Sequence, residues 1–499
     1  MRFKPSNPNS TARQPRRRQT LLCALLLLAL AASACLKATK PTLPKVFPAP
    51  QQLAPKNKPP LIIIPGILGT ELVNQKTKLR LWPELFPDDR DALLLPIASV
   101  NLRENRDDIV AARVIEQADL GKLVPQIGVY AGLLQALENY AGYKRGDIDN
   151  PASDGGSDTF YLFAYDWRRD NVEAAQALAG KIANLKAKLR QPELRFDVIA
   201  HSMGGLIARY YAMYGGRDVL SDQTQEPDWA GARHLNRLVL IGTPNAGSFD
   251  AFRTLLQGYS VTEANHTRVA LFRGLHQRMI FTVPSVYQLL PRNTGARFFN
   301  AKLERLPIDL FDVETWRQQQ WSAAFDPETQ ANERKGLAKN QGLAAGETAA
   351  QELAERRAHY LAAVLARARA FQHALDARSN TLINLPLHLI GGDCEPTITG
   401  AFLIKENGIP KTLFWPNNAL GNRQARRRAI DQIFLPGDGR VTRQSLFGLT
   451  LEPEASEPFL RAMKATPQQT LFNCDVHGDL PLNLIIQNNL LTVLLGNRY

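Results

Sequence analysis

The chain has 499 residues and a formal net charge of +13 at pH 7, with 44% apolar and 21% charged residues. This apolar fraction excludes a disordered chain and is sufficient for a large hydrophobic core. Four cysteines are too few to hold together a disulfide scaffold, and the absence of a repeat at a period of about 20–50 residues excludes a repeat protein.

The first 34 residues are predicted to be an export signal. Residues 1–20 carry six basic residues and no acid, Leu21–Leu30 form a short apolar stretch, and the small residues Ala31–Ala34 follow. An apolar stretch this short does not span a bilayer. Cys35 directly follows the small residues, which resembles the box at which bacterial lipoproteins are cleaved and acylated. We therefore expect the mature chain to begin at a lipidated Cys35, with a plain secretory signal and an incidental cysteine as the alternative.

Residues 35–58 are rich in lysine and proline and show almost no apolar periodicity. This composition is typical of a semi-rigid tether. We expect it to hold a globular domain, residues 59–499, close to a membrane, so that the protein is an exported lipoprotein anchored in the cell envelope. Without the six signal charges the net charge is +7, which favours anionic lipid headgroups over nucleic acid as a partner. Basic clusters such as Arg423 with Arg426–Arg428 most commonly form a solvated surface.

Short apolar strands alternate with helix-like stretches along residues 59–499. This pattern predicts an α/β fold with a mostly parallel sheet and helices on both faces. The alternation stops between Ser248 and Asn380, so we expect an inserted helical cap or lid at about 248–380 that ends in an amphipathic helix. The predicted strands are Leu61–Ile64, Phe160–Tyr165, Phe196–Ala200, Leu238–Ile241, Leu387–Ile390 and Thr470–Phe472, and the helix carries Leu361, Val364, Leu365, Ala368, Phe371 and Leu375 on one face.

One turn of the predicted sheet has the pattern of a nucleophile elbow. An apolar run ends in Ala200-His201-Ser202-Met203-Gly204 and leads into a helix-like segment. A sharp strand-to-helix turn strains the backbone of its serine and requires small residues two positions before and after it, here Ala200 and Gly204. We expect Ser202 to be a nucleophile and the Met203 N–H, at a helix start, to bind an oxyanion. An ordinary Ser/Gly turn is the alternative.

The first predicted strand supplies a second oxyanion donor. It runs into Pro65-Gly66-Ile67-Leu68-Gly69. A turn at this place sets the N–H of Ile67 beside the elbow.

A serine nucleophile also needs a base and an acid, which follow it along the chain in α/β-hydrolases. His477 lies after the last predicted strand and before an apolar helix expected at Leu480–Leu495, so it is the candidate base. Two acids are candidates. Asp393 directly follows a predicted strand, and Asp438 lies in a loop whose glycines allow its carboxylate to turn inward.

The remaining cysteines form a candidate pair. Cys23 leaves with the signal and Cys35 would be acylated, so Cys394 and Cys474 are left together in an oxidising compartment. Each follows a predicted strand, and neighbouring strand ends can bring two cysteines within bonding distance. We expect a disulfide that restrains the loop of His477 more than it holds the fold, with two unpaired buried cysteines as the alternative.

Several short motifs follow one another in the order and spacing of a known family. They are Pro65-Gly66-Ile67-Leu68-Gly69, Gly142-Tyr143 with Arg145-Gly146-Asp147, Tyr165-Asp166-Trp167-Arg168-Arg169, Ala200-His201-Ser202-Met203-Gly204, Gly242-Thr243-Pro244 with Gly247, Leu289-Leu290-Pro291, and Gly437-Asp438-Gly439 with Val441. In these motifs the chain resembles the lecithin:cholesterol acyltransferase and lysosomal phospholipase A2 family of α/β-hydrolases. The family's Gly-Asp-Gly-Thr-Val acid motif corresponds to Asp438, so the resemblance favours Asp438 over Asp393. Arg440 stands where the family has threonine, and the inserted region matches poorly.

The resemblance implies a serine hydrolase or acyltransferase that cleaves acyl esters of lipids, of the phospholipase, lipase or esterase type. Ser202 would attack the ester, His477 would take its proton and Asp438 would orient the imidazole. Lipid is the expected substrate and a membrane surface, reached through the anchor, the expected partner; no metal, organic cofactor or nucleic acid is expected. A catalytically silent lipid-binding lipoprotein and an amidase or peptidase with the same triad are the alternatives.

Overall fold

The computed structural model describes residues 56–83, 91–118, 127–221, 226–259, 275–292, 296–379, 381, 383–448 and 468–495. The predicted signal peptide, the predicted acylation site Cys35 and all but the last residues of the predicted tether lie outside these ranges. All described ranges belong to one compact unit, Phe47–Tyr499. No helix in them has both the length and the apolar character that crossing a bilayer requires.

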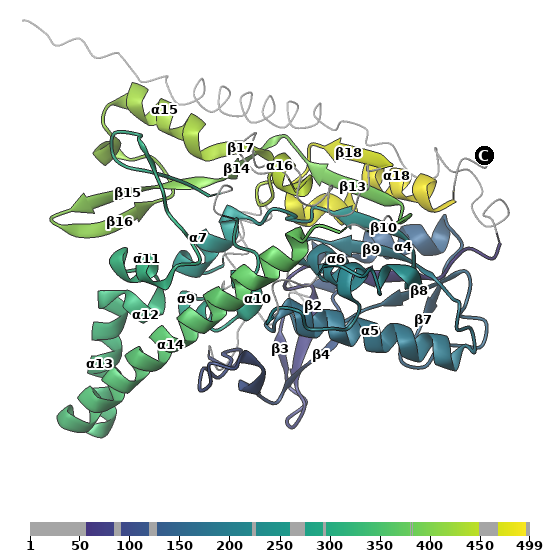
Figure 1. The fold of residues 1–499 in the computed structure, drawn as a ribbon, viewed down its shortest axis with the longest axis horizontal. Helices are drawn as coiled ribbons and strands as arrows, with labels where there is room; N and C mark the ends of the chain where they lie inside the picture. Colours follow the sequence, from purple (N-terminus) through teal and green to yellow (C-terminus); the bar gives the residue numbers. More distant parts are fainter. Residues whose placement is uncertain are drawn as a thin grey trace, which may run out of the picture. The chain divides into compact units, whose positions relative to one another are not determined.

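A seven-stranded sheet forms the centre of the fold (Figure 1). Its order is β18-β13-β10-β9-β1-β8-β7, and every neighbouring pair is parallel. The strands are β1 (Leu61–Ile64), β7 (Lys144–Gly146), β8 (Thr159–Leu162), β9 (Phe196–His201), β10 (Leu235–Ile241), β13 (Leu387–Gly392) and β18 (Gln469–Asn473). Every residue of β1 and β9 is buried, as expected for parallel strands covered on both faces. The predicted α/β fold with a mostly parallel sheet is confirmed.

Helices cover both faces of this sheet. Ile62 and Ile64 of β1 belong to one hydrophobic cluster with residues of α5 and α6, whereas Leu61 and Ile63 point to the opposite face. Helices α5 and α6 lie in front of the sheet in Figure 1, and α4 lies behind it and packs against α18. Their bounds are α4 (Ala131–Asn139), α5 (Asn171–Lys188), α6 (Met203–Tyr214) and α18 (Leu484–Leu495).

Residues between β10 and β13 form mainly helices in the described ranges. They are α7 (Phe249–Gln257), α9 (Gln277–Phe281), α10 (Pro284–Tyr287), α11 (Val313–Gln318), α12 (Ser322–Phe325), α13 (Pro327–Gln341) and α14 (Leu343–Asp376). The six apolar residues of the amphipathic helix expected at the end of this region lie on α14, and all six are buried. Their face packs into the main core, so this helix is held by apolar contacts with the sheet domain.

Smaller sheets surround the central one. They are the antiparallel β3-β2-β4, with β2 (Thr70–Asn74), β3 (Arg80–Trp82) and β4 (Ile109–Val114); the pair β5 (Gln117–Ala118) and β6 (Ile127–Gly128); the pair β14 (Glu395–Ile398) and β17 (Phe434–Gly437); and the sheet β12-β11-β15-β16, with β11 (Arg297–Phe299), β12 (Arg305–Leu306), β15 (Gly400–Glu406) and β16 (Ile409–Leu413). Short elements are η1 (Leu102–Glu104), η2 (Ala232–His234), η3 (Asn418–Leu420), η5 (His477–Leu482), α15 (Arg423–Ile433) and α16 (Arg443–Leu446).

The last helix differs from the predicted one. The apolar helix expected from Leu480 begins only at Leu484, and η5 precedes it. The side chain of Asn483 accepts hydrogen bonds from the N–H groups of Ile485 and Ile486, at 2.7 and 3.1 Å. This is an N-cap, which places the helix start directly after Asn483.

Candidate active site

Ser202 lies in the sharp turn between β9 and α6. Its φ of 53° and ψ of −126° are strained for a residue with a β-carbon. A β-carbon built at Gly204 would lie 2.4 Å from the carbonyl oxygen of Pro65, so only glycine fits two positions after the serine. The Ser202 N–H donates to the carbonyl of Ile241 in β10 over 2.8 Å. Local sequence and neighbouring strand together impose the elbow geometry.

His477 connects Ser202 with Asp438. Its Nε2 lies 2.8 Å from Oγ of Ser202, and its Nδ1 lies 2.8 Å from Oδ2 of Asp438. All three side chains are buried, with Ser202 6%, His477 9% and Asp438 2% exposed. A carboxylate only accepts, so it selects the tautomer with a proton on Nδ1 and leaves Nε2 free to accept the serine proton. The structure thus brings together three predicted site residues from distant parts of the chain.

The carboxylate of Asp438 is fixed by its own loop. Its Oδ1 accepts hydrogen bonds from the backbone N–H groups of Arg440 and Val441, at 3.0 and 2.7 Å. The N–H of His477 donates to the Asp438 carbonyl over 2.8 Å. The remaining carboxylate oxygen, Oδ2, is directed at the imidazole, so the acid has one defined orientation.

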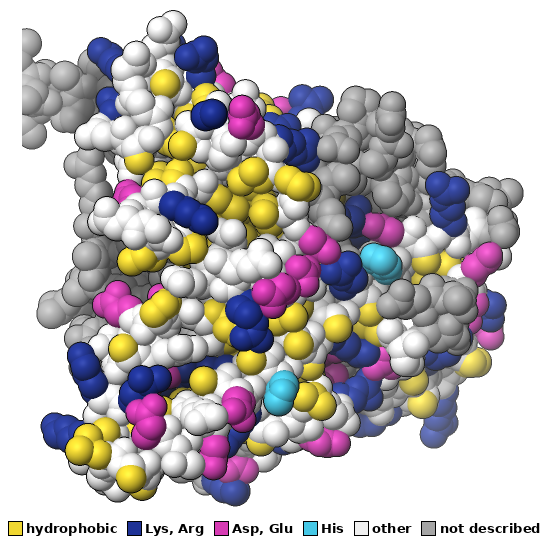
Figure 2. All heavy atoms as spheres, turned by 60° about the vertical axis from the view of Figure 1, so that its left-hand side comes forward, with side chains coloured by type: hydrophobic (Ala, Val, Ile, Leu, Met, Phe, Trp, Pro, Cys, Tyr) yellow, Lys and Arg dark blue, Asp and Glu magenta, His cyan; other side chains and the backbone are white. Residues whose placement is uncertain are grey.

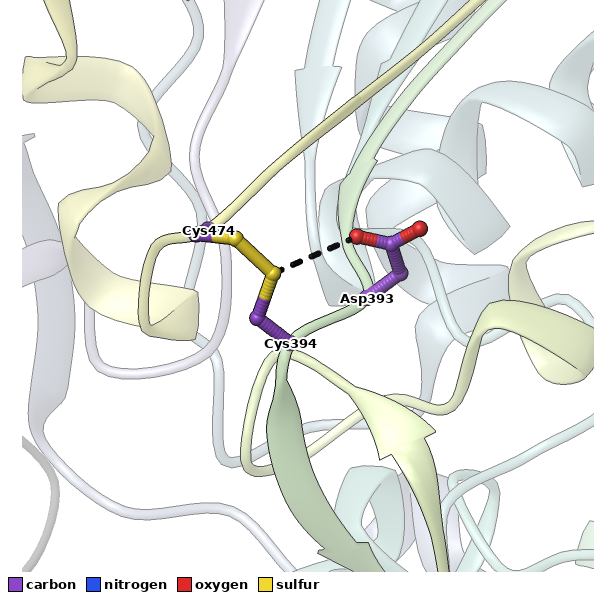
Figure 3. A group of neighbouring side chains, drawn as sticks. All are labelled: Asp393, Cys394 and Cys474. Atoms are coloured by element: carbon purple, nitrogen blue, oxygen red, sulfur yellow. Dashed lines mark hydrogen bonds between the residues drawn. A yellow bond between two sulfur atoms is a disulfide. The ribbon is translucent and has the colours of Figure 1, made fainter.

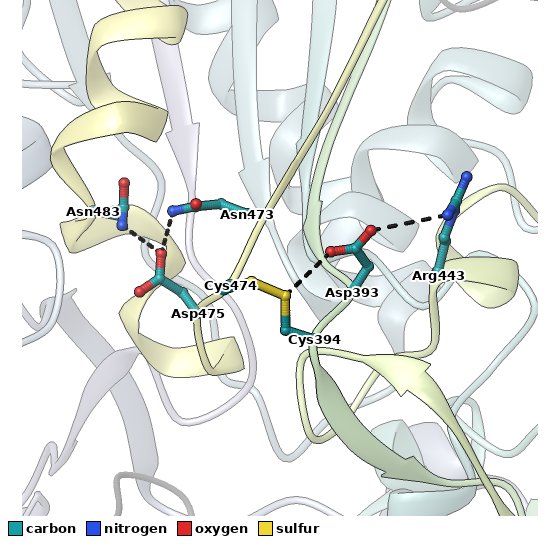
Figure 4. Close-up of a disulfide and its surroundings, with 7 residues drawn as sticks. All are labelled: Asp393, Cys394, Arg443, Asn473, Cys474, Asp475 and Asn483. Atoms are coloured by element: carbon teal, nitrogen blue, oxygen red, sulfur yellow. Dashed lines mark hydrogen bonds and ion pairs between the residues drawn. A yellow bond between two sulfur atoms is a disulfide. The ribbon is translucent and has the colours of Figure 1, made fainter.

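Asp393, the other candidate acid, does not join this network. Its Oδ2 lies 3.9 Å from a guanidinium nitrogen of Arg443, and Figure 4 shows Arg443 on the side of Asp393 that faces away from Cys474 and Asp475. Strand β13 continues to Gly392, where a β-carbon would lie 2.8 Å from Cβ of Asp438. Asp438 therefore packs across the end of β13, and the glycine makes room for it. Sequence reasoning missed Gly392, although a Gly-Gly pair directly before Asp393 was a visible signal.

The two predicted oxyanion donors lie beside Ser202. Met203 is the first residue of α6, where backbone N–H groups have no acceptor within the helix. Ile67 follows Gly66, and a β-carbon at Gly66 would lie 2.9 Å from Cβ of Ser202. Both N–H groups thus belong to backbone in close contact with the serine.

A hydrogen-bonded chain links the oxyanion turn to the base. The Gly66 N–H donates to the hydroxyl of Tyr130 over 2.8 Å, that hydroxyl lies 2.8 Å from Nδ1 of His201, and Nε2 of His201 lies 3.2 Å from the His477 carbonyl. An amide N–H only donates and a carbonyl only accepts. Tyr130 must therefore donate to Nδ1, and Nε2–H must donate to His477.

His201 is neutral in this arrangement. Burial, and next the neighbouring His477, lower the pKa of His201 to about 3. Nε2 of the His201 ring is directed at the backbone carbonyl of His477, whereas the hydroxyl of Ser202 is hydrogen-bonded to the imidazole of His477. Tyr130 was not predicted; nothing near it in sequence marks it, since its role arises from packing against residues far along the chain.

Arg440, the departure from the family motif, forms a partly buried ion pair. Its guanidinium contacts the carboxylate of Asp250 at 2.5 Å, and its central carbon lies 4.8 Å from the ring centre of Tyr259. The hydroxyl of Ser248 donates to the Arg440 carbonyl over 2.5 Å. Burial alone would raise the pKa of Asp250, but Arg440 and Arg253 lower it below its ordinary value. The acid loop is thereby fastened to the start of α7.

Cys394 and Cys474 are joined by a disulfide, with their Cα atoms 5.0 Å apart (Figure 3). Together with Asp393 they are the one group in the described ranges whose side chains are close enough to share a metal ion. Sulfurs in a disulfide are not thiolates and do not bind metal in this way. Next to Cys474, Asp475 accepts hydrogen bonds from Asn473 and Asn483 (Figure 4), so the segment before His477 is held on both sides.

A parallel sheet with a serine in a strand-to-helix elbow, followed along the chain by an acid and a histidine, defines an α/β-hydrolase. The family model described as lecithin:cholesterol acyltransferase matches residues 111–333. The resemblance found in the motifs is confirmed over this range.

Among three solved structures that resemble this chain, one matches closely enough to show a shared fold. A chain of the Tle4–Tli4 complex matches with a TM-score of 0.51 and 13% identity, over 87% of this chain and 98% of that chain. Phospholipase PlaB from Legionella pneumophila is 21% identical over 31% of this chain and 29% of its own, with a TM-score of 0.20. EstA from Clostridium botulinum is 12% identical over 89% and 88%, with a TM-score of 0.30. The last two scores are too low to show a shared fold. No curated protein matches in sequence.

Proposed function

We propose that this protein cleaves acyl esters of lipids through an acyl-enzyme intermediate on Ser202. The observation that carries the proposal is the single imidazole of His477 at 2.8 Å from both the Ser202 hydroxyl and the Asp438 carboxylate. The family match over residues 111–333 supports acyl lipids as the substrate class.

In the first step Oγ of Ser202 attacks the ester carbonyl while Nε2 of His477 takes the hydroxyl proton. The resulting imidazolium is stabilised by Asp438, which holds its Nδ1–H. The backbone N–H groups beside the serine, Ile67 and Met203, stabilise the negative oxygen of the tetrahedral intermediate. Collapse breaks the ester C–O bond, and the imidazolium gives its proton to the leaving alcohol.

In the second step an acceptor hydroxyl attacks the acyl-serine and loses its proton to Nε2 of His477. The bond between the acyl carbon and Oγ of Ser202 then breaks, and the imidazolium returns the proton to Oγ. Water as the acceptor releases a fatty acid, and a lipid alcohol yields a new ester. The same residues serve both reactions, so hydrolase and acyltransferase activity belong to one proposal.

The test is Ser202→Ala, assayed with a fluorophosphonate probe, a soluble p-nitrophenyl ester, phosphatidylcholine and a matched amide. We expect loss of labelling and of ester turnover with unchanged circular dichroism, whereas the exposed control Ser153→Ala keeps both. Turnover above about a tenth of wild type in Ser202→Ala would remove Ser202 as nucleophile. Faster amide than ester cleavage by the wild type would assign it to the amidases.

We further propose that Cys35 carries a lipid anchor in the cell envelope. Its support is the sequence alone: a basic start, a short apolar stretch and small residues before the cysteine. In Cys35→Ala we expect loss of lipid labelling and release from the membrane fraction. Unchanged labelling and retention would contradict the anchor.

A further inference from the structure

A second layer lies outside the central sheet and carries α15 on its outer face. The sheet β12-β11-β15-β16 divides its side chains between two clusters. Phe298 packs into the main core, whereas Phe299 and Phe402 pack with Ala429 of α15. Helix α15 and the edge strand β16 therefore form the outer surface of this part of the molecule.

Large apolar side chains are exposed in the layer that carries α15. Trp415 is 62% exposed and Ile409 is 55% exposed. Leu413 of β16 packs against the α15 cluster, and residues two apart on a strand point to the same side, which places Ile409 on the side of α15. The ring of Trp415 lies 5.1 Å from that of Phe434, the residue directly after α15. Trp415 thus stands at one end of the helix with most of its indole in solvent.

The same layer is strongly basic. Residues 297–306 and 400–433, which build its strands and helix, contain nine Lys or Arg and three Asp or Glu. Lys411 on β16 and Arg423, Arg427 and Arg428 on α15 are exposed. Figure 2 shows Lys and Arg side chains gathered at the top of this side of the molecule, with hydrophobic side chains directly below them. We call the six exposed residues Ile409, Lys411, Trp415, Arg423, Arg427 and Arg428 the α15 face.

This combination has a specific chemical match. Basic side chains near a bilayer are attracted to anionic headgroups, and an exposed indole is stabilised at the boundary between headgroups and acyl chains. A basic face that is merely solvated has no need of an exposed tryptophan. The composition of the α15 face therefore fits an anionic lipid surface better than it fits water alone.

The α15 face is also directly connected to the candidate active site. Helix α15 ends at Ile433, β17 follows at once, and Asp438 comes directly after β17. The four residues of β17 span about 13 Å at the rise of an extended strand. Because β17 pairs with β14, the connection is a two-stranded ribbon, which fixes α15 relative to Asp438 more firmly than a loop would.

We infer that the α15 face docks the protein on a bilayer that exposes anionic headgroups, so that Ser202 works next to a lipid surface. The inference rests on the proposed function, because it names where the lipid substrate is met. It adds a surface that is separate from the triad and that acts independently of the anchor proposed at Cys35.

The experiment compares variants of the full chain in a Cys35→Ala background, so that no acyl anchor contributes. Arg427→Glu with Arg428→Glu reverses two charges, and Trp415→Ala removes the indole. Each is measured by co-sedimentation with vesicles of phosphatidylcholine alone or with phosphatidylglycerol. We expect affinity for the anionic vesicles to fall on the order of 30-fold for the charge reversal and about tenfold for Trp415→Ala. Turnover of a soluble p-nitrophenyl ester stays at the wild-type level.

Matched controls lie on exposed positions of α13 and α14. Lys335→Glu with Lys339→Glu makes the same change in net charge, and Leu343→Ala removes a side chain that is 84% exposed. These controls keep wild-type vesicle binding if docking is specific to the α15 face. Equal losses in controls and α15 variants, or no loss in either, overturn the inference while soluble-ester turnover keeps the proposed function intact. Absence of ester turnover in the wild type would instead contradict the proposed function, and vesicle binding would still be decided separately.

Discussion

The hydroxyl of Tyr130 lies 2.8 Å from Nδ1 of His201, the residue before the candidate nucleophile Ser202. Through this contact the Gly66 N–H, at the oxyanion turn, is connected to the His477 carbonyl, at the base. Every donor and acceptor in this series of hydrogen bonds is determined. The side chains of Tyr130 and His201 therefore cannot rotate without leaving a buried polar group unpaired.

Tyr130→Phe tests this chain. Removal of the hydroxyl leaves the Gly66 N–H and Nδ1 of His201 without their partner, so we expect a stability loss of about 1–3 kcal/mol. Because the oxyanion turn and the base both lose a restraint, kcat should fall about tenfold while KM changes less than about twofold. The control is Tyr143→Phe, whose hydroxyl has only a 3.4 Å contact with the Pro59 carbonyl. Wild-type kcat in Tyr130→Phe would contradict a positioning role.

His201 predicts an acid-dependent loss of stability. Its pKa is lowered from 6.5 to about 3 by burial and by His477, so the unfolded chain binds the extra proton between these values. The stability it contributes is complete above about pH 6.5 and declines as the pH falls toward 3. His201→Gln should therefore show a shallower dependence of the free energy of unfolding on pH across this window. The exposed control His359→Gln should retain the wild-type slope, and an unchanged slope in His201→Gln would refute the assignment.

Asp438→Asn and Asp393→Asn separate the two acids. An amide at residue 438 no longer selects the Nδ1–H tautomer of His477, so kcat should fall by a factor on the order of 10³–10⁴. Asp393 has no contact with His477, so Asp393→Asn should stay within about threefold of wild type. Steady-state rates on a soluble ester decide the matter, and a larger loss at residue 393 would reassign the acid.

Arg440→Thr restores the residue that the family motif carries. It also removes one of the two cationic partners of Asp250, whose side chain is 5% exposed, so we expect destabilisation by about 2–4 kcal/mol. In Arg440→Thr the buried carboxylate of Asp250 keeps only Arg253 as a charged partner, 2.7 Å away. Adding Asp250→Asn removes this poorly compensated charge and should recover at least half of the loss in chemical denaturation. If the double variant is no more stable than Arg440→Thr, the ion pair is not the reason that arginine is tolerated here.

The disulfide predicts a local effect on the base. Cys394→Ser with Cys474→Ser releases the segment three residues before His477, whereas the core of the sheet is untouched. We expect kcat to fall about five- to tenfold with a fall of only a few degrees in Tm. A large fall in Tm with unchanged kcat would show that the bond holds the fold instead of the site.

Sequence patterns predicted those parts of the molecule whose cause is local. The elbow at Ser202 follows from small residues at fixed spacing, and six central strands follow from apolar runs. Strand β7 was missed because Lys144, Arg145 and Gly146 carry no apolar signal; it is an edge strand held by pairing with β8. Strand β8 ends at Leu162, before the predicted end at Tyr165.

Contacts between residues that lie far apart in the sequence could not be predicted from local patterns. No sequence motif around Tyr130 or Asp250 indicates that these residues contact the neighbours of the triad. The family motif favoured Asp438, which the structure places next to His477. Position directly after a strand favoured Asp393, which lies outside the network. The physical reason, close packing of Asp438 on Gly392, needs both loops in place.

Strands β10 and β13 are direct neighbours in the sheet, although residues 242–386 separate them along the chain. The entropic cost of closing so long a loop grows only with the logarithm of its length, about 0.6 kcal/mol for each doubling. Insertions in this region therefore cost the folded state little, provided that they pack as α14 does. Evolution can lengthen or replace the segment while the pairing of β10 with β13, and of β13 with the strand β18 that precedes His477, stays the same. The same separation affects folding, because β13 can pair with β10 only after this long loop has closed. We therefore expect the turn that holds Ser202 to form before Asp438 and His477 reach it.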